Sequence, residues 1–240
     1  MQNLEALLSK ASDLVWGPPL LILLFGTHLF LTVRLKFIQR YLPQAIKLSF
    51  SREKEGEGDV TQFGALTTAL AATIGTGNIV GVSTAVAAGG PGAVLWMWLT
   101  GVFGVATKYA EAVLAVKFRV RAADGSMAGG PMYALERGLG SKALGMMFAA
   151  LTAIAAFGIG CMTQANSIST LAHDTFGVAP WITGSVLAVL TAIVVLGGIK
   201  SIANVCEKLV PFMAAFYILG CLILIVMHIE KLPDTLATIF

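Results

Sequence analysis

The residues best suited to binding chemistry form a short polar interruption in a long apolar stretch. Within residues 61–88, residues 75–78 read Gly-Thr-Gly-Asn, so two glycines, a hydroxyl and a carboxamide stand in series. Each glycine in a helix costs about 1 kcal/mol relative to alanine and frees the backbone to unwind. The run therefore predicts a helix broken into two halves, over residues 62–74 and 79–88.

A helix that breaks inside a membrane presents backbone groups of opposite polarity. The half that begins near Ile79 offers N–H groups and a positive dipole end, which suit a carboxylate. The half that ends near Ile74 offers carbonyls, which suit a small cation. Further oxygens at the same depth come from Thr73, Thr76 and Asn78. Close helix packing is the alternative, because the same segment is rich in alanine and glycine.

A second polar set lies in another apolar stretch, over residues 143–172. Its members are Thr163, Gln164, Asn166, Ser167 and Thr170. Gln164 and Ser167 are three positions apart and share a helix face. At least one polar face of this helix must therefore point into the helix bundle, where it can bind a ligand. The alternative is an interhelical hydrogen bond, worth about 0.6–2 kcal/mol in a membrane.

Composition places these polar groups in a bilayer. Of the 240 residues, 57% are hydrophobic and 12% are charged, whereas soluble domains average about 25% charged residues. A net charge of +3 without a basic stripe argues against nucleic-acid binding. Three isolated cysteines argue against a disulfide framework or a metal site. The sequence predicts an all-α integral membrane protein.

We predict six membrane spans, divided at charges, Gly/Pro clusters and loops. They cover residues 14–35, 61–88, 92–118, 143–172, 181–199 and 206–228. Residues 124–142 are too polar to cross, and they are expected to form a short interfacial helix that starts at Pro131.

The distribution of positive charge predicts the orientation of these spans. Thirteen of the sixteen Lys and Arg residues lie in three connections on one side. They lie within residues 34–54 and 117–142, with Lys200 and Lys208 near the turn between the fifth and sixth spans. The positive-inside rule places these connections in the cytoplasm and both termini of the chain outside.

Few other ionisable side chains lie within the predicted spans. Lys108 and Glu111 are three positions apart and can form an ion pair on a helix. His28 is expected to bond a neighbouring hydroxyl or carbonyl rather than to relay protons. Because no paired catalytic set lies at this depth, we predict a protein that is not an enzyme and has no organic cofactor.

Longer motifs carry a family resemblance. The run GTGNIVGVSTAVAAGGPGAVLWMWLTGVFG at residues 75–104 resembles the signature region of the alanine or glycine:cation symporter family, sodium-coupled carriers of small amino acids. Supporting stretches are AGGPMY at 128–133, the ERGLG that follows it, and QANSI at 164–168. The match covers most of residues 61–210. Leu95 departs from the pattern, which has Phe before WMW, but the change is apolar for apolar.

The resemblance implies a LeuT-type fold, built from two five-helix repeats inverted in the membrane. Residues 1–60 would then form a peripheral transmembrane helix and a basic cytoplasmic loop. Residues 61–240 would form the first repeat, which contains the broken helix over 61–88. A second repeat, in the same chain or a partner chain, is expected to complete the carrier.

The resemblance also implies roles for individual residues. The expected substrate-binding residues are Thr76, Gly77, Gln164 and Ser167. The first two would hold a carboxylate through their backbone N–H groups. The expected cation-binding residues are Ala71, Thr73, Ile74 and Asn78, with sodium as the ion.

The implied function is sodium-coupled symport of a small neutral amino acid, such as alanine or glycine, by alternating access. The implied location is the plasma membrane of a prokaryote, which is the inner membrane in a Gram-negative cell. One alternative is an inactive fragment or a half-transporter subunit that needs a second repeat. An ion-channel subunit is less favoured, because no charged ring or repeated pore loop is visible in the sequence.

Overall fold

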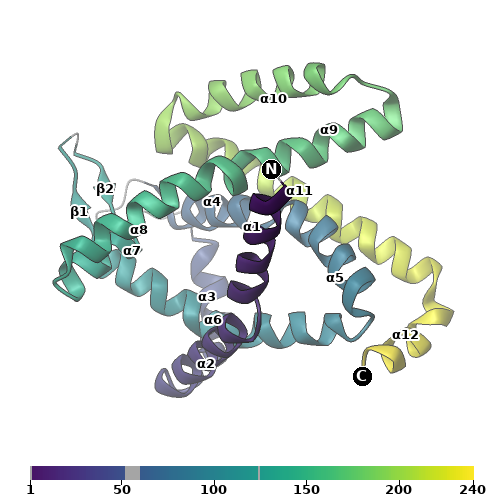
Figure 1. The fold of residues 1–240 in the computed structure, drawn as a ribbon, viewed down its shortest axis with the longest axis horizontal. Coiled ribbons are helices and arrows are strands. Elements are labelled where there is room, and N and C mark those ends of the chain that lie inside the picture. The colour runs from purple at the N-terminus through teal and green to yellow at the C-terminus, as the bar shows by residue number, and fades with distance from the viewer. Residues whose placement is uncertain (1, 52–59, 124) are drawn as a thin grey trace.

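The computed structural model describes residues 2–51, 60–123 and 125–240, and these are almost entirely helical (Figure 1). Arg52 and Lys54 of the predicted basic loop lie outside these residues. The α-helices are α1 (Gln2–Val15), α2 (Pro18–Arg34), α3 (Leu42–Ser49), α4 (Gln62–Thr73), α5 (Val82–Gly89), α6 (Ala93–Lys117), α7 (Pro131–Tyr133), α8 (Lys142–Ala155), α9 (Thr163–Phe176), α10 (Pro180–Val195), α11 (Gly198–Met227) and α12 (Leu232–Ile239). The π-helical stretches are η2 (Gly77–Gly81), η3 (Ala134–Gly138) and η4 (Ala156–Met162). The 3-10 turns are η1 (Ile38–Tyr41) and η5 (Ile229–Lys231), and the strands are β1 (Val120–Arg121) and β2 (Met127–Ala128).

Most of the predicted spans correspond to helices of membrane-crossing length. Among the described residues, four apolar stretches are long enough, namely Ala6–Arg34, Ala93–Lys117, Lys142–Phe176 and Gly198–Met227. A bent helix pair, Gln62–Thr73 with Gly77–Gly89, supplies a fifth when it is taken as one span. The expected span over 181–199 corresponds only to the 16-residue α10, which falls short of a full crossing at about 1.5 Å per residue.

The predicted break in the second span is confirmed. α4 ends at Thr73, and the helix that resumes as η2 and α5 is bent by 51° relative to it. Ile74 between them is extended, with φ of −85° and ψ of 106°, so the helical hydrogen-bond ladder stops at this residue. Figure 1 shows the two halves, α4 and α5, pointing in different directions.

The turn between α10 and α11 lies earlier than predicted. α11 begins at Gly198 and includes residues 200–205, which we expected outside a span. Gly198 has a φ of 71°, a conformation that glycine adopts without strain, so the chain reverses within two or three residues. Because α11 starts at Gly198, Pro211 lies well inside this helix.

A small polar substructure between α6 and α8 was predicted only in part. The short helix α7 begins at Pro131, as expected. Before it, β1 and β2 pair in antiparallel register, with Val120 opposite Ala128. Strands of two residues have no periodic pattern that a sequence reading could detect.

Contacts between helices remote in sequence hold the fold together. α4 packs along α11, and α2 packs along α6. α9 and α10 lie side by side as an antiparallel pair (Figure 1). Gly177 ends α9 in a left-handed conformation, and its N–H donates to the His173 carbonyl at 2.8 Å.

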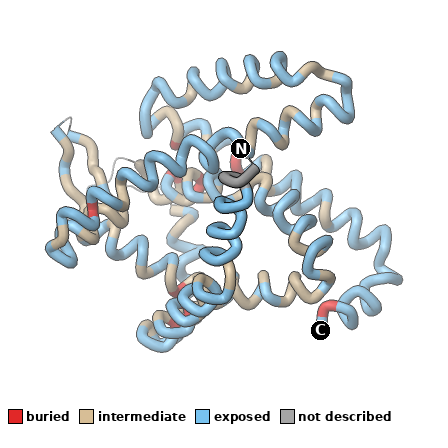
Figure 2. The backbone as a smooth tube through the Cα atoms, in the orientation of Figure 1, coloured by how far each residue is buried: buried red, intermediate tan, exposed pale blue. Residues whose placement is uncertain are grey.

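Most of the described residues are exposed (Figure 2). The buried hydrophobic residues are Ala106, Ala203, Val210 and Ile239. Many Leu, Ile, Val and Phe side chains are exposed, including residues throughout α10 and α11. An apolar surface of this extent suits contact with lipid or with further protein rather than with water.

Gly145 sets the approach of α8 to the α7–η3 segment. An added Cβ there would lie 2.8 Å from the Met132 carbonyl oxygen and 3.3 Å from Glu136 Cβ. We predict that Gly145→Ala lowers the free energy of unfolding by about 1–3 kcal/mol, the usual cost of overpacking. The measurement is thermal unfolding of the purified protein in detergent.

Gly184→Ala in α10 is the matched control, because nothing lies within 4 Å of its added Cβ. This substitution should leave stability unchanged or raise it, since alanine favours helix over glycine. Equal effects of the two substitutions would contradict the packing described for Gly145.

Candidate functional site

The break replaces two helical hydrogen bonds by bonds to side chains. In a continuous helix, the N–H groups of Gly75 and Thr76 would reach the carbonyls four residues earlier. Instead, the Gly75 N–H donates to Asn78 Oδ1 at 3.2 Å. The Thr76 N–H donates to Gln164 Oε1 at 3.3 Å. The two carbonyls at the end of α4 therefore lose these helical donors.

Gln164 joins α9 to the break. Its Oε1 accepts a second hydrogen bond, from Thr76 Oγ1 at 2.6 Å, and both side chains are half-buried. Gln164 also lies beside Gly75, where an added Cβ would be 3.5 Å from Oε1, an ordinary van der Waals distance. Two predicted site residues that are 88 positions apart in the sequence are thus in direct contact.

The π-helical stretch η4 determines which face of α9 meets the break. It runs from Ala156 to Met162 and ends two positions before Gln164. A π turn holds more residues than an α turn, so it rotates everything that follows relative to a regular helix. Gly158 and Gly160 are only an indirect sign of this irregularity in the sequence.

The predicted cation ligands lie on the α4 side of the break and within it. The Ala71 carbonyl is one of the two that lose their helical donors. Thr73 Oγ1 donates to the Ala69 carbonyl at 2.8 Å, which leaves its own lone pairs available. Asn78 Oδ1 accepts one bond and has capacity for another. Ile74 is the extended residue of the break itself, so its carbonyl is outside the α4 ladder.

Two further predicted substrate residues, Gly77 and Ser167, are not tied to the break by a side-chain hydrogen bond among the described residues. Gly77 begins η2, and nothing lies within 4 Å of a Cβ added there. Ser167 is half-buried on α9, and among the described residues no hydrogen bond joins it to the break. Their roles stay predictions.

A small cavity of about 80 Å³ lies between the break and α11. Its lining residues are Ile74, Gly75, Asn78, Ile79, Met213 and Tyr217. The cavity has room for more than one water molecule, and its walls are apolar. Sequence analysis did not single out the α11 residues, because an apolar helix face carries no mark of what it will contact.

A second polar contact fixes the start of α4 to α11. Thr61 is the N-cap of α4, and its Oγ1 accepts a hydrogen bond from the Gly64 N–H at 2.9 Å. The same hydroxyl donates to Glu207 Oε1 at 2.9 Å, and Glu207 is half-buried. Sequence analysis did not predict this contact, because Thr61 and Glu207 lie 146 positions apart in the chain.

Two other polar pairs were expected and are present. His28 is buried, and its Nδ1 lies 2.7 Å from Thr107 Oγ1. Lys108 Nζ lies 3.0 Å from Glu111 Oε2, and both side chains are exposed. Both pairs involve α6 rather than the broken helix.

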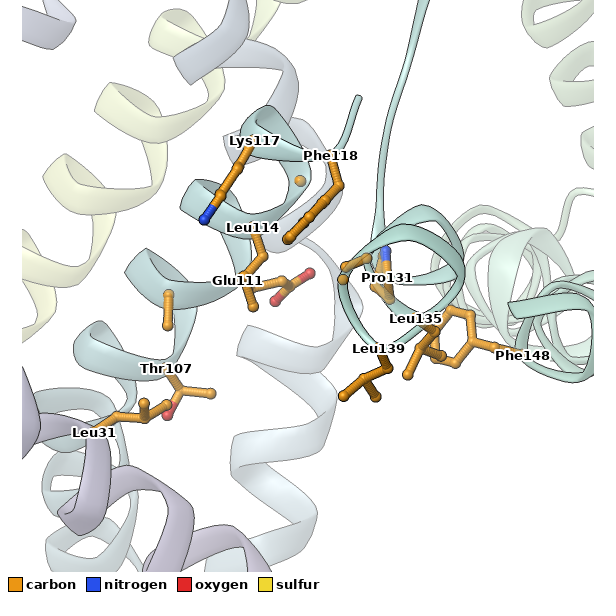
Figure 3. Close-up of a pocket in the computed structure, with 14 residues that line it drawn as sticks. Leu31, Thr107, Glu111, Leu114, Lys117, Phe118, Pro131, Leu135, Leu139 and Phe148 are labelled. Carbon is orange, nitrogen blue, oxygen red and sulfur yellow. The ribbon is translucent and has the colours of Figure 1, made fainter. Parts of the chain in front are cut away.

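A larger open pocket of about 790 Å³ lies between α6 and the α7–η3 segment (Figure 3). Leu114 on α6 lies opposite Leu135 and Leu139 in this view. The pocket is lined mostly by apolar residues, and its Glu111 is already paired with Lys108. Hydrogen-bond donors and neutral oxygens are gathered at the break instead, so we place the candidate site there.

Comparison with known proteins assigns the chain to a family, independently of the geometry of the site. The chain matches the sodium:alanine symporter family over residues 1–240. It is 54% identical to the sodium/alanine symporter AgcS of Methanococcus maripaludis, over 98% of this chain and 53% of the relative. It is 53% identical to an uncharacterized transporter of Haemophilus influenzae, over 99% of this chain and 52% of the relative. It is 38% identical to the amino-acid carrier protein AlsT of Bacillus subtilis, over 98% and 50%.

The chain therefore spans about half the length of these relatives. The match confirms the resemblance that the run at residues 75–104 indicated, and it is to a family of transporters rather than of enzymes. Several apolar helices of crossing length agree with a multi-pass membrane protein. The chain belongs to the sodium:alanine symporter family.

Proposed function

We propose that this chain carries half of the binding site of a symporter that couples a small neutral amino acid, such as alanine, to sodium. The observation that carries the proposal is the broken helix at residues 74–76, in contact with Gln164 of α9. The break gathers N–H donors and neutral oxygens in one place. Membership of the family and 54% identity to AgcS support the same assignment.

The substrate would bind where the second half of the broken helix begins. Its carboxylate would meet the backbone N–H groups of Thr76 and Gly77, at the positive end of the η2–α5 dipole. Gln164 Oε1 and the Ser167 hydroxyl would accept hydrogen bonds from the α-ammonium group. A zwitterion needs both kinds of partner, and these residues supply them without a net charge.

The sodium ion would bind at the end of the first half. The Ala71 and Ile74 carbonyls, the Thr73 hydroxyl and Asn78 Oδ1 are all neutral oxygens, which are the ligands that small hard cations prefer. The ion would then offset the partial negative charge at the C-terminal end of α4.

Transport would proceed by alternating access in a LeuT-type fold of two inverted five-helix repeats. Residues 1–60 would be peripheral, and residues 61–240 would form the first repeat. The relatives are about twice as long as this chain, which leaves length for a second repeat that completes the site. The basic connections would face the cytoplasm in a prokaryotic plasma membrane, with both ends of the chain on the outer side.

A direct test is uptake of labelled L-alanine into proteoliposomes that contain the complete natural protein. We expect uptake to require a sodium gradient, because the proposed site binds the two solutes side by side. Replacement of sodium by choline should reduce uptake to the level of protein-free liposomes. Equal uptake in sodium and choline would contradict the coupling, and labelled glycine in the same assay would compare the two substrates.

Asn78→Ala tests the cation site. We expect this substitution to raise the sodium concentration for half-maximal uptake by about tenfold, the equivalent of about 1.4 kcal/mol for one lost ligand. Asn204→Ala, on the exposed surface of α11, is the matched control and should leave the sodium dependence unchanged.

Asn78 also accepts the Gly75 N–H, so its loss could act on the fold alone. Thermal unfolding in sodium-free buffer separates the two effects, because a bound ion stabilises the folded state by mass action. A loss of stability in sodium-free buffer together with an unchanged sodium requirement would show that Asn78 only caps the break.

A further inference from the structure

Gln164 occupies the donors that the proposed substrate carboxylate needs. Its Oε1 accepts hydrogen bonds from both the backbone N–H and the hydroxyl of Thr76, at 3.3 and 2.6 Å. A carboxylate that takes the Thr76 N–H must displace this oxygen, since a second strong acceptor at the same N–H would leave both bonds poorly aligned.

We propose that Gln164 is an internal substitute for the substrate carboxylate, which latches α9 to the broken helix until substrate exchanges with it. This inference rests on the function proposed above and adds a second state to it. In the latched state the amide oxygen satisfies Thr76. In the bound state the carboxylate satisfies Thr76, and the released amide oxygen accepts a hydrogen bond from the substrate's ammonium group.

The bilayer makes such an exchange necessary. An N–H group at the break of a membrane helix has no bulk water to bond, so leaving it without an acceptor is costly. A carrier that works by alternating access must also change conformation without substrate. The latch keeps the Thr76 donors paired during that step, and the exchange keeps them paired when substrate binds.

The chemistry of the two acceptors gives the exchange its direction. Hydrogen bonds to a carboxylate are roughly twice as strong as those to a neutral amide, so the substrate can displace Gln164. A molecule with an ammonium group but no carboxylate cannot make the exchange. The latch therefore selects for the carboxylate, and alaninamide is a probe that lacks it.

Local geometry supports a side chain that can move. Gln164 rests against Gly75, and the nearest of its atoms would be 3.5 Å from a Cβ added at that glycine. Its surroundings are half-buried rather than closed, and η4 precedes it with a widened turn. The amide can leave the break by side-chain rotation, without a shift of the α4 backbone.

Hydrogen–deuterium exchange of the segment 74–81 in the complete natural protein tests the proposal. Gln164→Met keeps the length of the side chain and removes its acceptor, and Gln44→Met on the exposed surface of α3 is the matched control. Without substrate, we expect Gln164→Met to raise exchange of this segment several-fold over wild type and over the control. Saturating L-alanine with sodium should return it to the wild-type level, whereas alaninamide should not.

Two results would overturn the latch. Unchanged exchange without substrate would mean that Gln164 does not protect the break. Raised exchange that persists with saturating alanine, in a variant shown by uptake to use alanine, would mean that Gln164 is a fixed packing contact. The exchange comparison without substrate does not depend on transport. A failed uptake assay for the wild type would therefore refute the proposed function, but it would leave the exchange difference between Gln164→Met and wild type valid.

Thr76→Val gives a second test. An ordinary defect in the binding site would raise the alanine concentration for half-maximal uptake, whereas loss of the latch should lower it. The substitution removes the 2.6 Å hydroxyl bond to Gln164 and keeps the backbone N–H. We expect a weaker latch, and a roughly fivefold lower alanine concentration for half-maximal uptake, from the loss of one neutral hydrogen bond. Thr76→Ser keeps a hydroxyl that can bond Gln164, so it should need more alanine for half-maximal uptake than Thr76→Val. A higher alanine requirement in Thr76→Val would overturn the proposal.

Discussion

Everything distinctive about this chain follows from the cost of unpaired backbone groups in a membrane. A spanning helix must pair every N–H and carbonyl within itself, so a break is stable only where other groups replace the lost bonds. Here the replacements are two side chains, Asn78 from the same segment and Gln164 from α9. The break thus requires a side chain of α9 beside it, and it leaves carbonyl oxygens at the end of α4 without their helical donors.

The first half of the broken helix, α4, is held by α11. α4 packs along α11, and the Thr61–Glu207 contact fixes its first turn to that helix. This arrangement leaves η2 and α5, beyond the bend, tied to α9 through Thr76. The two halves of this span therefore contact different helices: α4 contacts α11, and the segment beyond the bend contacts α9. A rocking motion between those neighbours would act directly on the groups at the break.

Sequence patterns predicted the features that depend on local composition. The broken helix, the start of α7 at Pro131 and the pairing of Lys108 with Glu111 follow from residue type and spacing alone. The contact between Gln164 and Thr76 could be predicted only in part. Each residue stands out as a polar group in an apolar stretch, but nothing in the sequence pairs them. The Glu207 contact, the β1–β2 hairpin and the early start of α11 escaped prediction, since each depends on tertiary packing or on backbone freedom at single glycines such as Gly198.

The length of α10 has a consequence for the surrounding lipid. Its 16 residues extend about 24 Å, less than the hydrocarbon thickness of an ordinary bilayer. A helix of this length that crosses the membrane creates a hydrophobic mismatch, which the bilayer relieves by thinning locally or the flanking residues by snorkelling. Because α10 packs against α9, that deformation would be felt next to the helix that carries Gln164. Acyl-chain length would then influence the conformation of the α9–α10 pair.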